Sequence, residues 1–234
     1  MSTILPRVTP RRELPTELDP LELSADRRAA AHMVASLLLD YPDDAWYARL
    51  PLLQERAAVL PTPIAEALTG FIAAATAAGT TEWQRRYVVT FDLKRKCSLY
   101  LSYYATGDTR KRGTALVTFL EAYRAAGWEF HAQELPDYLP AVLEFSALSD
   151  SPIAEALIAS HREGIEVLRA ALEAMDSEWA AVVRAVTLSL PPVDARTRER
   201  FLALVSEGPP TETVGLSFLG TLAPFAPVSQ RGES

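Results

Sequence analysis

The sequence predicts an all-α protein that folds as a single compact domain of about nine to eleven helices. Apolar residues recur at helical spacing along most of its 234 residues, and prolines and glycines divide them into separate stretches. No run of β-branched residues alternates with a period of two, which argues against strands. We expect an irregular, proline-containing arm over residues 1–22, a helical domain over residues 23–206 and a mobile tail over residues 207–234.

The helices expected in the first half of the domain follow capping or breaking residues. Ser24 is a suitable N-cap for the first helix, and Gly79 is a stop signal for the third. The last of these helices depends on the helical spacing of Leu93, Cys97 and Leu101. The expected ranges are 24–39, 51–59, 64–77, 82–90 and 93–105.

The second half is predicted in the same way. Asp108 is the expected N-cap of the first of these helices, and Gly127 is its stop signal. Pro152 lies near the first turn of the longest helix, whose apolar stripe includes His161 as an expected core residue. Ser177 is the expected N-cap of the next. The expected ranges are 109–126, 138–147, 152–175, 177–189 and 193–205.

Composition excludes several classes of protein. The net charge of −7 argues against general attraction to the phosphates of a nucleic acid. The single cysteine, Cys97, cannot form an internal disulfide and fits a reducing compartment. The chain contains no apolar run of the ~18 residues that a membrane helix needs, and no apolar core follows the pair Arg11 and Arg12. We therefore expect a cytoplasmic protein without stable membrane association.

The sequence also argues against catalysis. The three histidines, His32, His131 and His161, form no pair at the helical spacing of a metal site, and no glycine-rich phosphate loop is present. The helical phase of Cys97 favours a buried packing residue over a reactive thiol. We expect no enzyme activity, no bound metal and no cofactor of its own.

The segment over residues 87–127 is the most unusual part of the chain. It contains five aromatic residues between Tyr87 and Tyr104, and two basic clusters, at residues 94–96 and 110–112. Cations in the first turn of a helix oppose its macrodipole, so Arg110, Lys111 and Arg112 need a compensating role. Three interpretations remain open: internal ion pairs, contact with a client enzyme or an anionic cofactor, and a nucleic-acid patch. The internal partners considered are Asp92, Glu121, Asp137 and Glu144.

Several strings of residues resemble one known family. They are YVVTFDLKR at residues 87–95, LYL at residues 99–101, GDTRKRG at residues 107–113 and ELPD at residues 134–137. These strings resemble the nitrate reductase molybdenum cofactor assembly chaperones of the NarJ family, which belong to the wider TorD/DmsD-like group. The resemblance extends from about Arg27 to Leu216.

The resemblance implies a TorD-like helical domain that works as a chaperone. Its partner would be the apo catalytic (alpha) subunit of a respiratory nitrate reductase, bound chiefly at its N-terminal peptide. The chaperone would support molybdenum cofactor insertion before the subunit docks at the membrane. Two alternatives remain: a chaperone or adaptor for a different molybdoenzyme or redox enzyme, and an enzyme whose site is assembled from scattered acids.

The candidate peptide-binding residues lie in two places. One is the aromatic-rich segment, and the other is the loop before residue 139, which resembles an acidic, proline-containing loop associated with client recognition in the wider group. For both, a structural role is the alternative: core packing for the aromatic residues, and a turn with solvated acids for the loop. The candidates are Tyr87, Phe91, Asp92, Tyr104, Glu134, Pro136, Asp137 and Tyr138, with client or cofactor contact considered for Arg110, Lys111 and Arg112.

Overall fold

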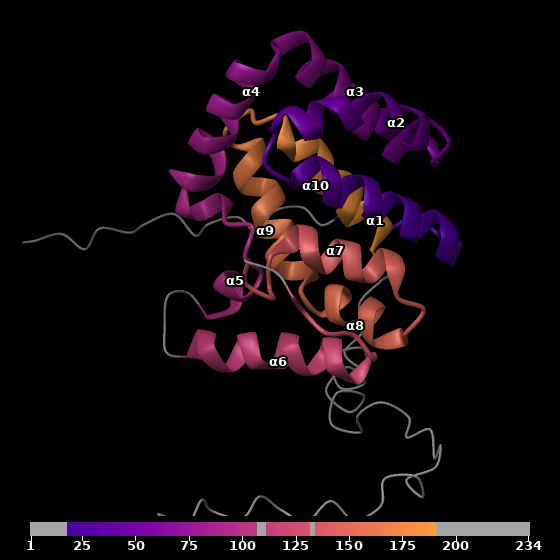
Figure 1. Ribbon diagram of the computed structural model, residues 1–234, viewed down its shortest axis with the longest axis vertical. Coiled ribbons are helices and arrows are strands. Elements are labelled where there is room, and N and C mark those ends of the chain that lie inside the picture. The colour runs from indigo at the N-terminus through magenta and orange to yellow at the C-terminus, as the bar shows by residue number, and fades with distance from the viewer. Residues whose placement is uncertain (1–17, 107–110, 132–133, 191–234) are drawn as a thin grey trace, which may run out of the picture.

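The computed structural model describes residues 18–106, 111–131 and 134–190, and these form one compact helical domain (Figure 1). Ten α-helices lie in the described ranges, which confirms the all-α prediction. A π-helical turn, Val88–Asp92, and a 3-10 turn, Arg95–Cys97, follow the fourth helix. The helices are α1 Ala25–Leu39, α2 Asp44–Ala58, α3 Thr62–Ala78, α4 Thr80–Tyr87, α5 Ser102–Thr106, α6 Lys111–Ala125, α7 Leu139–Leu148, α8 Pro152–Ser160, α9 Arg162–Glu173 and α10 Trp179–Ser189.

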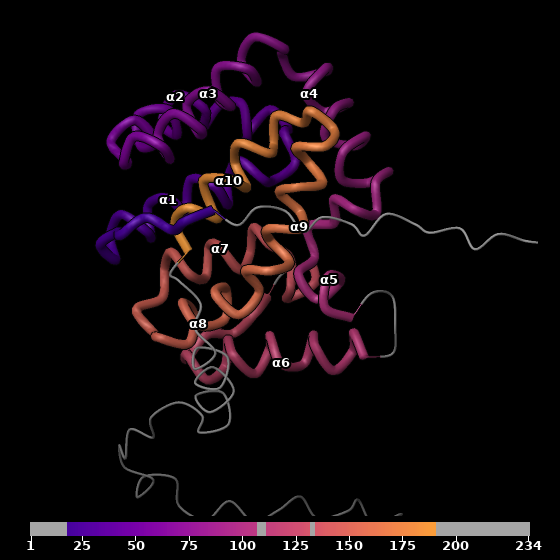
Figure 2. The backbone as a smooth tube through the Cα atoms, turned by 180° about the vertical axis from the view of Figure 1, so that it is seen from behind, coloured from indigo at the N-terminus to yellow at the C-terminus, as the bar shows by residue number. Residues whose placement is uncertain are grey.

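Helices from the two ends of the described chain meet at the centre of the domain. α10 packs against α3, α1 and α9, and α1 packs in turn against α7. Figures 1 and 2 show α2, α3 and α4 at one end of the domain and α6 at the opposite end. The core therefore joins residues that are far apart in the sequence.

A cluster of aromatic side chains fills the core where α3, α4 and α10 meet. The ring centroids of Trp83 and Trp179 lie 4.9 Å apart, and Phe71 lies 5.3 Å from the first and 5.6 Å from the second. Both tryptophans are fully buried. Rings of this size dominate the apolar area that a core removes from water.

Several helix boundaries agree with the sequence signals. The Ser24 hydroxyl accepts a hydrogen bond from the Arg27 backbone nitrogen, as expected for the N-cap of α1. Gly79, after α3, has a φ of 76°, and Gly127, two residues after α6, has a φ of 80°. Both values lie in the region that favours glycine. The expected cap of α6, Asp108, lies outside the described residues.

The expected helix over residues 93–105 is wrong. Its first apolar residue, Leu93, is 68% exposed, and the chain after the 3-10 turn is extended until α5 begins. There the Leu101 backbone N–H donates to the Asp137 carbonyl oxygen at 2.9 Å, and the Leu139 N–H donates to the Leu99 carbonyl at 2.7 Å. An isolated antiparallel bridge joins Tyr100 to the residue after Asp137. Pairing with this distant loop thus replaces the helical ladder.

Three other expectations are corrected at helix ends. The helix expected from Pro51 begins earlier, because Asp43 accepts a hydrogen bond from the Trp46 backbone nitrogen and caps α2. The long helix over residues 152–175 is divided at His161 into α8 and α9. α10 begins after Glu178 instead of Ser177.

The division at His161 leaves the apolar stripe intact, because buried residues continue through both α8 and α9. The half-buried His161 ring packs against Phe119, with centroids 4.7 Å apart. Its Nδ1 lies 2.9 Å from the Leu157 carbonyl oxygen, the helical acceptor of the preceding turn. The side chain is therefore satisfied within the fold.

Only part of the expected arm is described. Residues 18–23 form no helix and pack along the core, with the Leu21 N–H donating to the Leu188 carbonyl at 2.8 Å. The Leu18 carbonyl accepts from Arg162 at 2.6 Å. Residues 1–17, the helix expected over residues 193–205 and the tail from residue 207 lie outside the described ranges.

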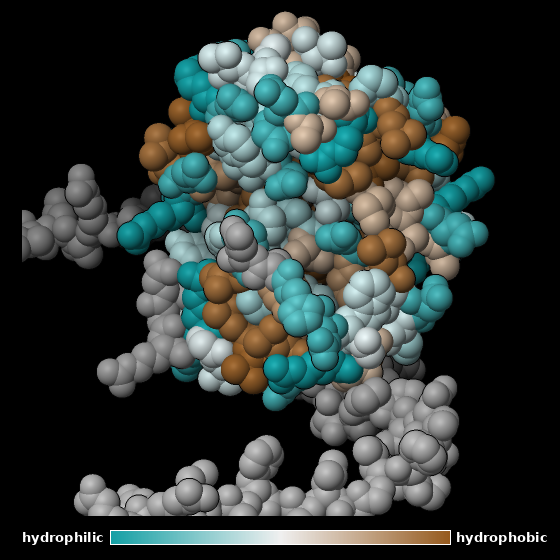
Figure 3. All heavy atoms as spheres, in the orientation of Figure 1, coloured by the Kyte–Doolittle hydropathy of each residue, from teal (hydrophilic) through white to brown (hydrophobic). Residues whose placement is uncertain are grey.

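The described helices are each too short or too polar to cross a membrane. Figure 3 shows apolar and hydrophilic side chains interleaved on one face of the domain, with an apolar patch over α6. Val117 of that helix is 49% exposed. Single exposed apolar residues of this kind are normal for a folded domain.

His32 is expected to make the protein less stable as the pH falls below about 6.5. Burial, followed by the charge of Arg28, lowers the pKa of His32 from 6.5 to about 3. Between pH 6.5 and pH 3, the imidazole of His32 is protonated in the unfolded chain but stays neutral in the folded chain. The free energy of unfolding that is present above pH 6.5 is therefore lost as the pH falls through this range. The contribution of His32 is at most about 1.4 kcal/mol per pH unit.

Denaturant unfolding at several pH values across this window checks the prediction. The control is His32→Gln, which has no titrating imidazole. Because carboxyl groups also titrate in this window, the informative quantity is the difference between the two slopes of unfolding free energy against pH. Equal slopes would contradict the prediction.

Candidate functional site

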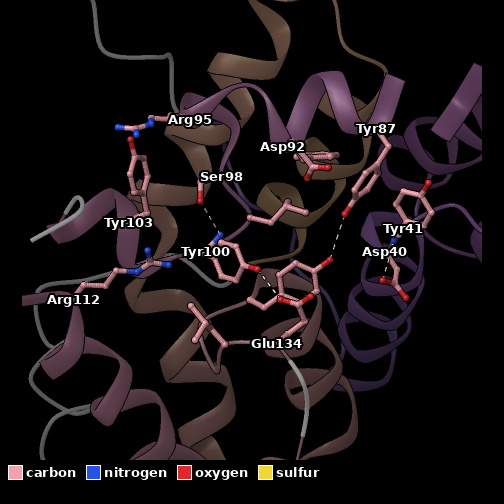
Figure 4. A pocket seen from close by; sticks show the side chains of 14 residues that line it. Asp40, Tyr41, Tyr87, Asp92, Arg95, Ser98, Tyr100, Tyr103, Arg112 and Glu134 are labelled. Atoms are coloured by element: carbon pink, nitrogen blue, oxygen red, sulfur yellow. Dashed lines mark hydrogen bonds between the residues drawn. The ribbon is translucent and has the colours of Figure 1, made fainter. Parts of the chain in front are cut away.

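A cavity of about 570 Å³ opens on the surface between the end of α1, the π-helical turn, the extended segment before α5, the start of α6 and the loop before α7 (Figure 4). Its lining is rich in aromatic and charged side chains. The lining residues are Asp40, Tyr41, Tyr87, Phe91, Asp92, Arg95, Ser98, Leu99, Tyr100, Tyr103, Arg112, Glu134, Leu135 and Tyr138. We call this cavity the groove.

Aromatic rings form the floor of the groove. The Tyr87 ring lies 5.4 Å from Tyr41 and 4.8 Å from Phe91, and the Tyr100 ring lies 5.6 Å from Tyr138, all between centroids. The hydroxyl oxygens of Tyr87 and Tyr138 are 3.4 Å apart, which links the two groups of rings. Such rings offer a large apolar surface with polar edges and little conformational freedom to lose.

The π-helical turn places part of this floor. The Leu93 N–H donates to the Val88 carbonyl at 3.1 Å, five residues back along the chain. Tyr87 and Phe91 both lie against the buried Trp179, with centroids 5.7 and 5.5 Å from it. Tyr87 and Phe91 therefore pack on the core, as the structural alternative expects, and they also line the groove.

Charged residues lie on both sides of the floor. Asp40 and Asp92 are exposed at one side, and Figure 4 shows Arg95 and Arg112 at the other. The Arg112 guanidinium carbon lies 5.5 Å from the Tyr100 ring centroid, within the range of a cation–π contact. The candidate acidic residues therefore line only part of the groove.

The hydroxyls of Tyr87, Tyr100 and Tyr138 stay protonated at neutral pH, because burial raises the pKa of each. The Tyr100 hydroxyl donates to Glu134 Oε2 at 2.7 Å, and burial followed by this hydrogen bond raises the pKa of Tyr100. Burial also raises the pKa of Tyr138 to about 12. These hydroxyls therefore supply no negative charge to the groove, and the single hydrogen of the Tyr100 hydroxyl is already donated to Glu134.

The structure places two of the predicted loop residues in the interior. Asp137 is fully buried, and its Oδ2 accepts hydrogen bonds from the Ser102 backbone nitrogen at 3.0 Å and the Ser102 hydroxyl at 2.5 Å. Pro136 is buried as well, and its carbonyl accepts from the Tyr123 hydroxyl at 2.9 Å. The idea of two solvated acids is therefore wrong for Asp137, which supports the groove from behind.

Tyr104 also lies outside the groove lining. Its hydroxyl donates to the Ser98 carbonyl at 2.8 Å, and it packs on α9, where a Cβ added to Gly164 would lie 3.0 Å from its own Cβ. Gly164 has no Cβ, and this permits the close approach of Tyr104 to α9. Tyr104 thus holds the extended segment against the core.

The residues of the basic cluster at 110–112 lie in different surroundings. Arg112 lines the groove, Lys111 is exposed beside it, and Arg110 lies outside the described residues. Within the described ranges, no ion pair joins Lys94, Lys96 or Lys111 to a carboxylate.

Several groove residues were missed as candidates by the sequence analysis. Asp40 and Tyr41 follow the end of α1 and carry no local signal of a site. Tyr100 had one: in the string CSLYL at residues 97–101, apolar residues alternate with Ser98 and Tyr100, a period of two that is typical of an extended chain. The other missed residues are Ser98, Leu99, Tyr103 and Leu135, while Arg95 belongs to the basic cluster at residues 94–96.

The described residues contain no cluster of three or more histidine, cysteine or acidic side chains that could hold a metal. Cys97 is fully buried, as its apolar neighbours predicted, and burial raises the pKa of its thiol. The groove offers rings, hydrogen-bond donors and fixed charges. These are features of a surface that binds a peptide.

Comparisons with known proteins agree with the family resemblance. The family model described as nitrate reductase delta subunit matches residues 57–185. The probable nitrate reductase molybdenum cofactor assembly chaperone NarJ of Bacillus subtilis is 32% identical over 165 residues, which cover 69% of this chain and 88% of the relative. The Escherichia coli K12 chaperone NarJ is 33% identical over 160 residues, covering 64% of this chain and 65% of that protein.

A longer protein carries a similar region. The nitrate reductase-like protein NarX of Mycobacterium tuberculosis is 36% identical over 152 residues, which cover 65% of this chain but 23% of NarX. The family match spans more than half of the chain, and the Bacillus subtilis relative is similar over most of its length. The chain therefore belongs to the nitrate reductase delta subunit family, the family of the NarJ assembly chaperones.

Proposed function

We propose that this protein is a cytoplasmic chaperone that binds the apo catalytic subunit of a respiratory nitrate reductase. Its main contact is the N-terminal peptide of that subunit, bound in the groove. It keeps the subunit competent for molybdenum cofactor insertion and delays membrane docking until insertion is complete. The names of the relatives support the assembly role, and the groove supports the peptide contact.

The observation that carries the proposal is the aromatic floor of the groove. Its volume of about 570 Å³ lies in the range of well-formed ligand sites. An amphipathic peptide helix can lay its apolar side chains on Tyr87, Phe91 and Tyr138 while its polar side faces water. Binding of this kind masks the apolar face of the peptide and is reversible, as a temporary chaperone requires.

Calorimetric titration with a synthetic N-terminal peptide of the catalytic subunit tests this function. We expect a Kd in the micromolar range or tighter, and no comparable binding of a scrambled peptide or an unrelated export-signal peptide. Tighter binding of a peptide from another redox enzyme would contradict the proposal and support the alternative of a different client.

Two double variants place the binding site. Tyr41→Ser with Leu135→Ser changes two exposed groove residues and should weaken binding about tenfold or more. The matched control is Leu52→Ser with Val59→Ser, which removes two exposed apolar side chains at α2, away from the groove. Equal affinities of the two double variants would show that the peptide binds elsewhere.

A further inference from the structure

The groove lies between two helix ends of opposite polarity. α1 ends at Leu39 with Asp40 as its C-cap, and both Asp40 and Tyr41 line the groove. α6 begins at Lys111, and the next residue, Arg112, lines the groove as well. The carbonyl end of a helix carries partial negative charge and the amide end partial positive charge. The two helix dipoles therefore place partial charges of opposite sign near the two ends of the groove.

The aromatic floor connects these two ends in a defined order. Starting from Tyr41, the contacts run to Tyr87 at 5.4 Å between centroids and to Tyr138 at 3.4 Å between hydroxyl oxygens. They continue to Tyr100 at 5.6 Å between centroids and to the Arg112 guanidinium, 5.5 Å from that ring. The two charged ends are thus separated by the width of several rings, as Figure 4 shows.

Side-chain charges reinforce the polarity of the backbone at both ends. Asp40 and Asp92 are exposed and line the groove, and Figure 4 shows both on the side of Tyr41 and Tyr87. Arg95 and Arg112 add positive charge at the end where α6 begins.

We infer that the groove binds a helical peptide in one direction, with the amino end beside Asp40 and Asp92 and the carboxyl end beside Arg112. A peptide helix is positive at its amino end and negative at its carboxyl end, so this direction matches charge at both ends. The reverse direction would place like charges together. Charge complementarity of this kind selects orientation more than it adds affinity.

Glu134 adds a preference for a basic residue in the middle of the bound peptide. It lies between the two ends in Figure 4, and its Oε2 already accepts a hydrogen bond from the Tyr100 hydroxyl. A carboxylate can accept further hydrogen bonds, so a lysine or arginine from the middle of the peptide can pair with it. The inference rests on the proposed function and adds the direction of the client peptide.

Photo-crosslinking tests the direction with the full chain. The probe is the synthetic N-terminal peptide of the catalytic subunit, made once with a benzophenone residue near its amino end and once near its carboxyl end. Mass spectrometry of the crosslinked chain should place the first label around residues 39–41 and 92. It should place the second label around residue 95 or 112. The reverse pattern, or equal labelling of both regions by each peptide, would overturn the inference.

Titration of both labelled peptides before crosslinking separates this inference from the proposed function. If the groove double variant abolishes binding but the crosslinking pattern is reversed, the inferred peptide direction is wrong and the proposed function still holds. Absence of binding by the unlabelled peptide overturns the proposed function, and the inference with it.

A second measurement removes charge from the amino end of the peptide. Acetylation of the peptide amine should weaken binding to the wild-type protein about two- to fivefold, as expected for an exposed charge pair. Asp40→Asn with Asp92→Asn should abolish most of this difference. The matched control is Asp26→Asn with Asp150→Asn, two exposed aspartates outside the groove lining. An acetylation effect of the same size in both double variants would overturn the inference.

Discussion

Replacement of Trp179 by alanine is expected to lower the free energy of unfolding by about 3–5 kcal/mol. The side chain is fully buried at the first residue of α10. Its ring lies within 6 Å of four others, between centroids, so the truncation would leave a cavity directly beneath the groove floor. The four neighbouring rings are Phe71, Trp83, Tyr87 and Phe91.

Urea unfolding followed by circular dichroism measures this loss, with Trp179→Phe as the matched control. Phenylalanine keeps a ring in place, so we expect it to lose less stability than alanine. A cost below about 1 kcal/mol for Trp179→Ala, the size of an ordinary substitution, would contradict the role of Trp179 as the support of the floor.

Asp137→Ala is expected to weaken peptide binding about tenfold although Asp137 does not line the groove. The carboxylate holds Ser102 at the start of α5, and the backbone of Asp137 pairs with Leu101. These bonds fix the register of Tyr100 against Tyr138, the middle of the groove floor. Alanine would leave the buried Ser102 donors without their acceptor, at a cost of about 1–3 kcal/mol in the free energy of unfolding.

Asp137→Asn is the control that separates the hydrogen bonds to Ser102 from the negative charge of Asp137. The asparagine side-chain oxygen can accept from the same Ser102 groups, so its stability and peptide affinity should stay close to those of the wild type. Calorimetric titration and urea unfolding of both variants check this. Wild-type affinity in a folded Asp137→Ala variant would contradict the positioning role, and an affinity loss of equal size in both variants would point to the charge itself.

The helices were predictable where the signals are local. Ser24 and Gly79 act through neighbouring backbone groups, so a few residues of sequence contain the information for these boundaries. The aromatic pair Tyr87 and Phe91 was predictable for a similar reason, since residues four apart on a helix share a face. Their rings lie 4.8 Å apart even though a π-helical turn begins between them.

The extended segment before α5 was not predictable from the spacing of apolar residues. Leu93, Cys97 and Leu101 are also four residues apart, yet Leu93 is exposed, Cys97 is buried at the end of the 3-10 turn and Leu101 is buried in a non-helical segment. What decides the conformation is pairing with the loop at residues 137–139, which lies more than thirty residues away in the sequence. Helical spacing cannot distinguish these outcomes when a tertiary partner supplies the backbone hydrogen bonds.

The charge pattern of the groove was only partly predictable. Asp92 and Glu134 were expected at an acidic edge, and both line the groove. Asp40 follows α1 and Arg112 lies in α6, and only the folded domain brings these opposite charges to one groove. Asp137 was assigned to the edge by its sequence neighbours, but its carboxylate turns inward to Ser102 because α5 needs an acceptor there.

The central claim is that the groove acts on the client during assembly, and it is tested most directly in cells that lack the gene for this chain. These cells receive the wild-type chain, the groove variant Tyr41→Ser with Leu135→Ser, or the control Leu52→Ser with Val59→Ser. The measured quantity is the molybdenum content per nitrate reductase catalytic subunit, with the amount of each chaperone checked in parallel. We predict that the wild type and the control restore the molybdenum content and that the groove variant does not. Full molybdenum content with the groove variant, or in cells that receive no chaperone, would contradict the account.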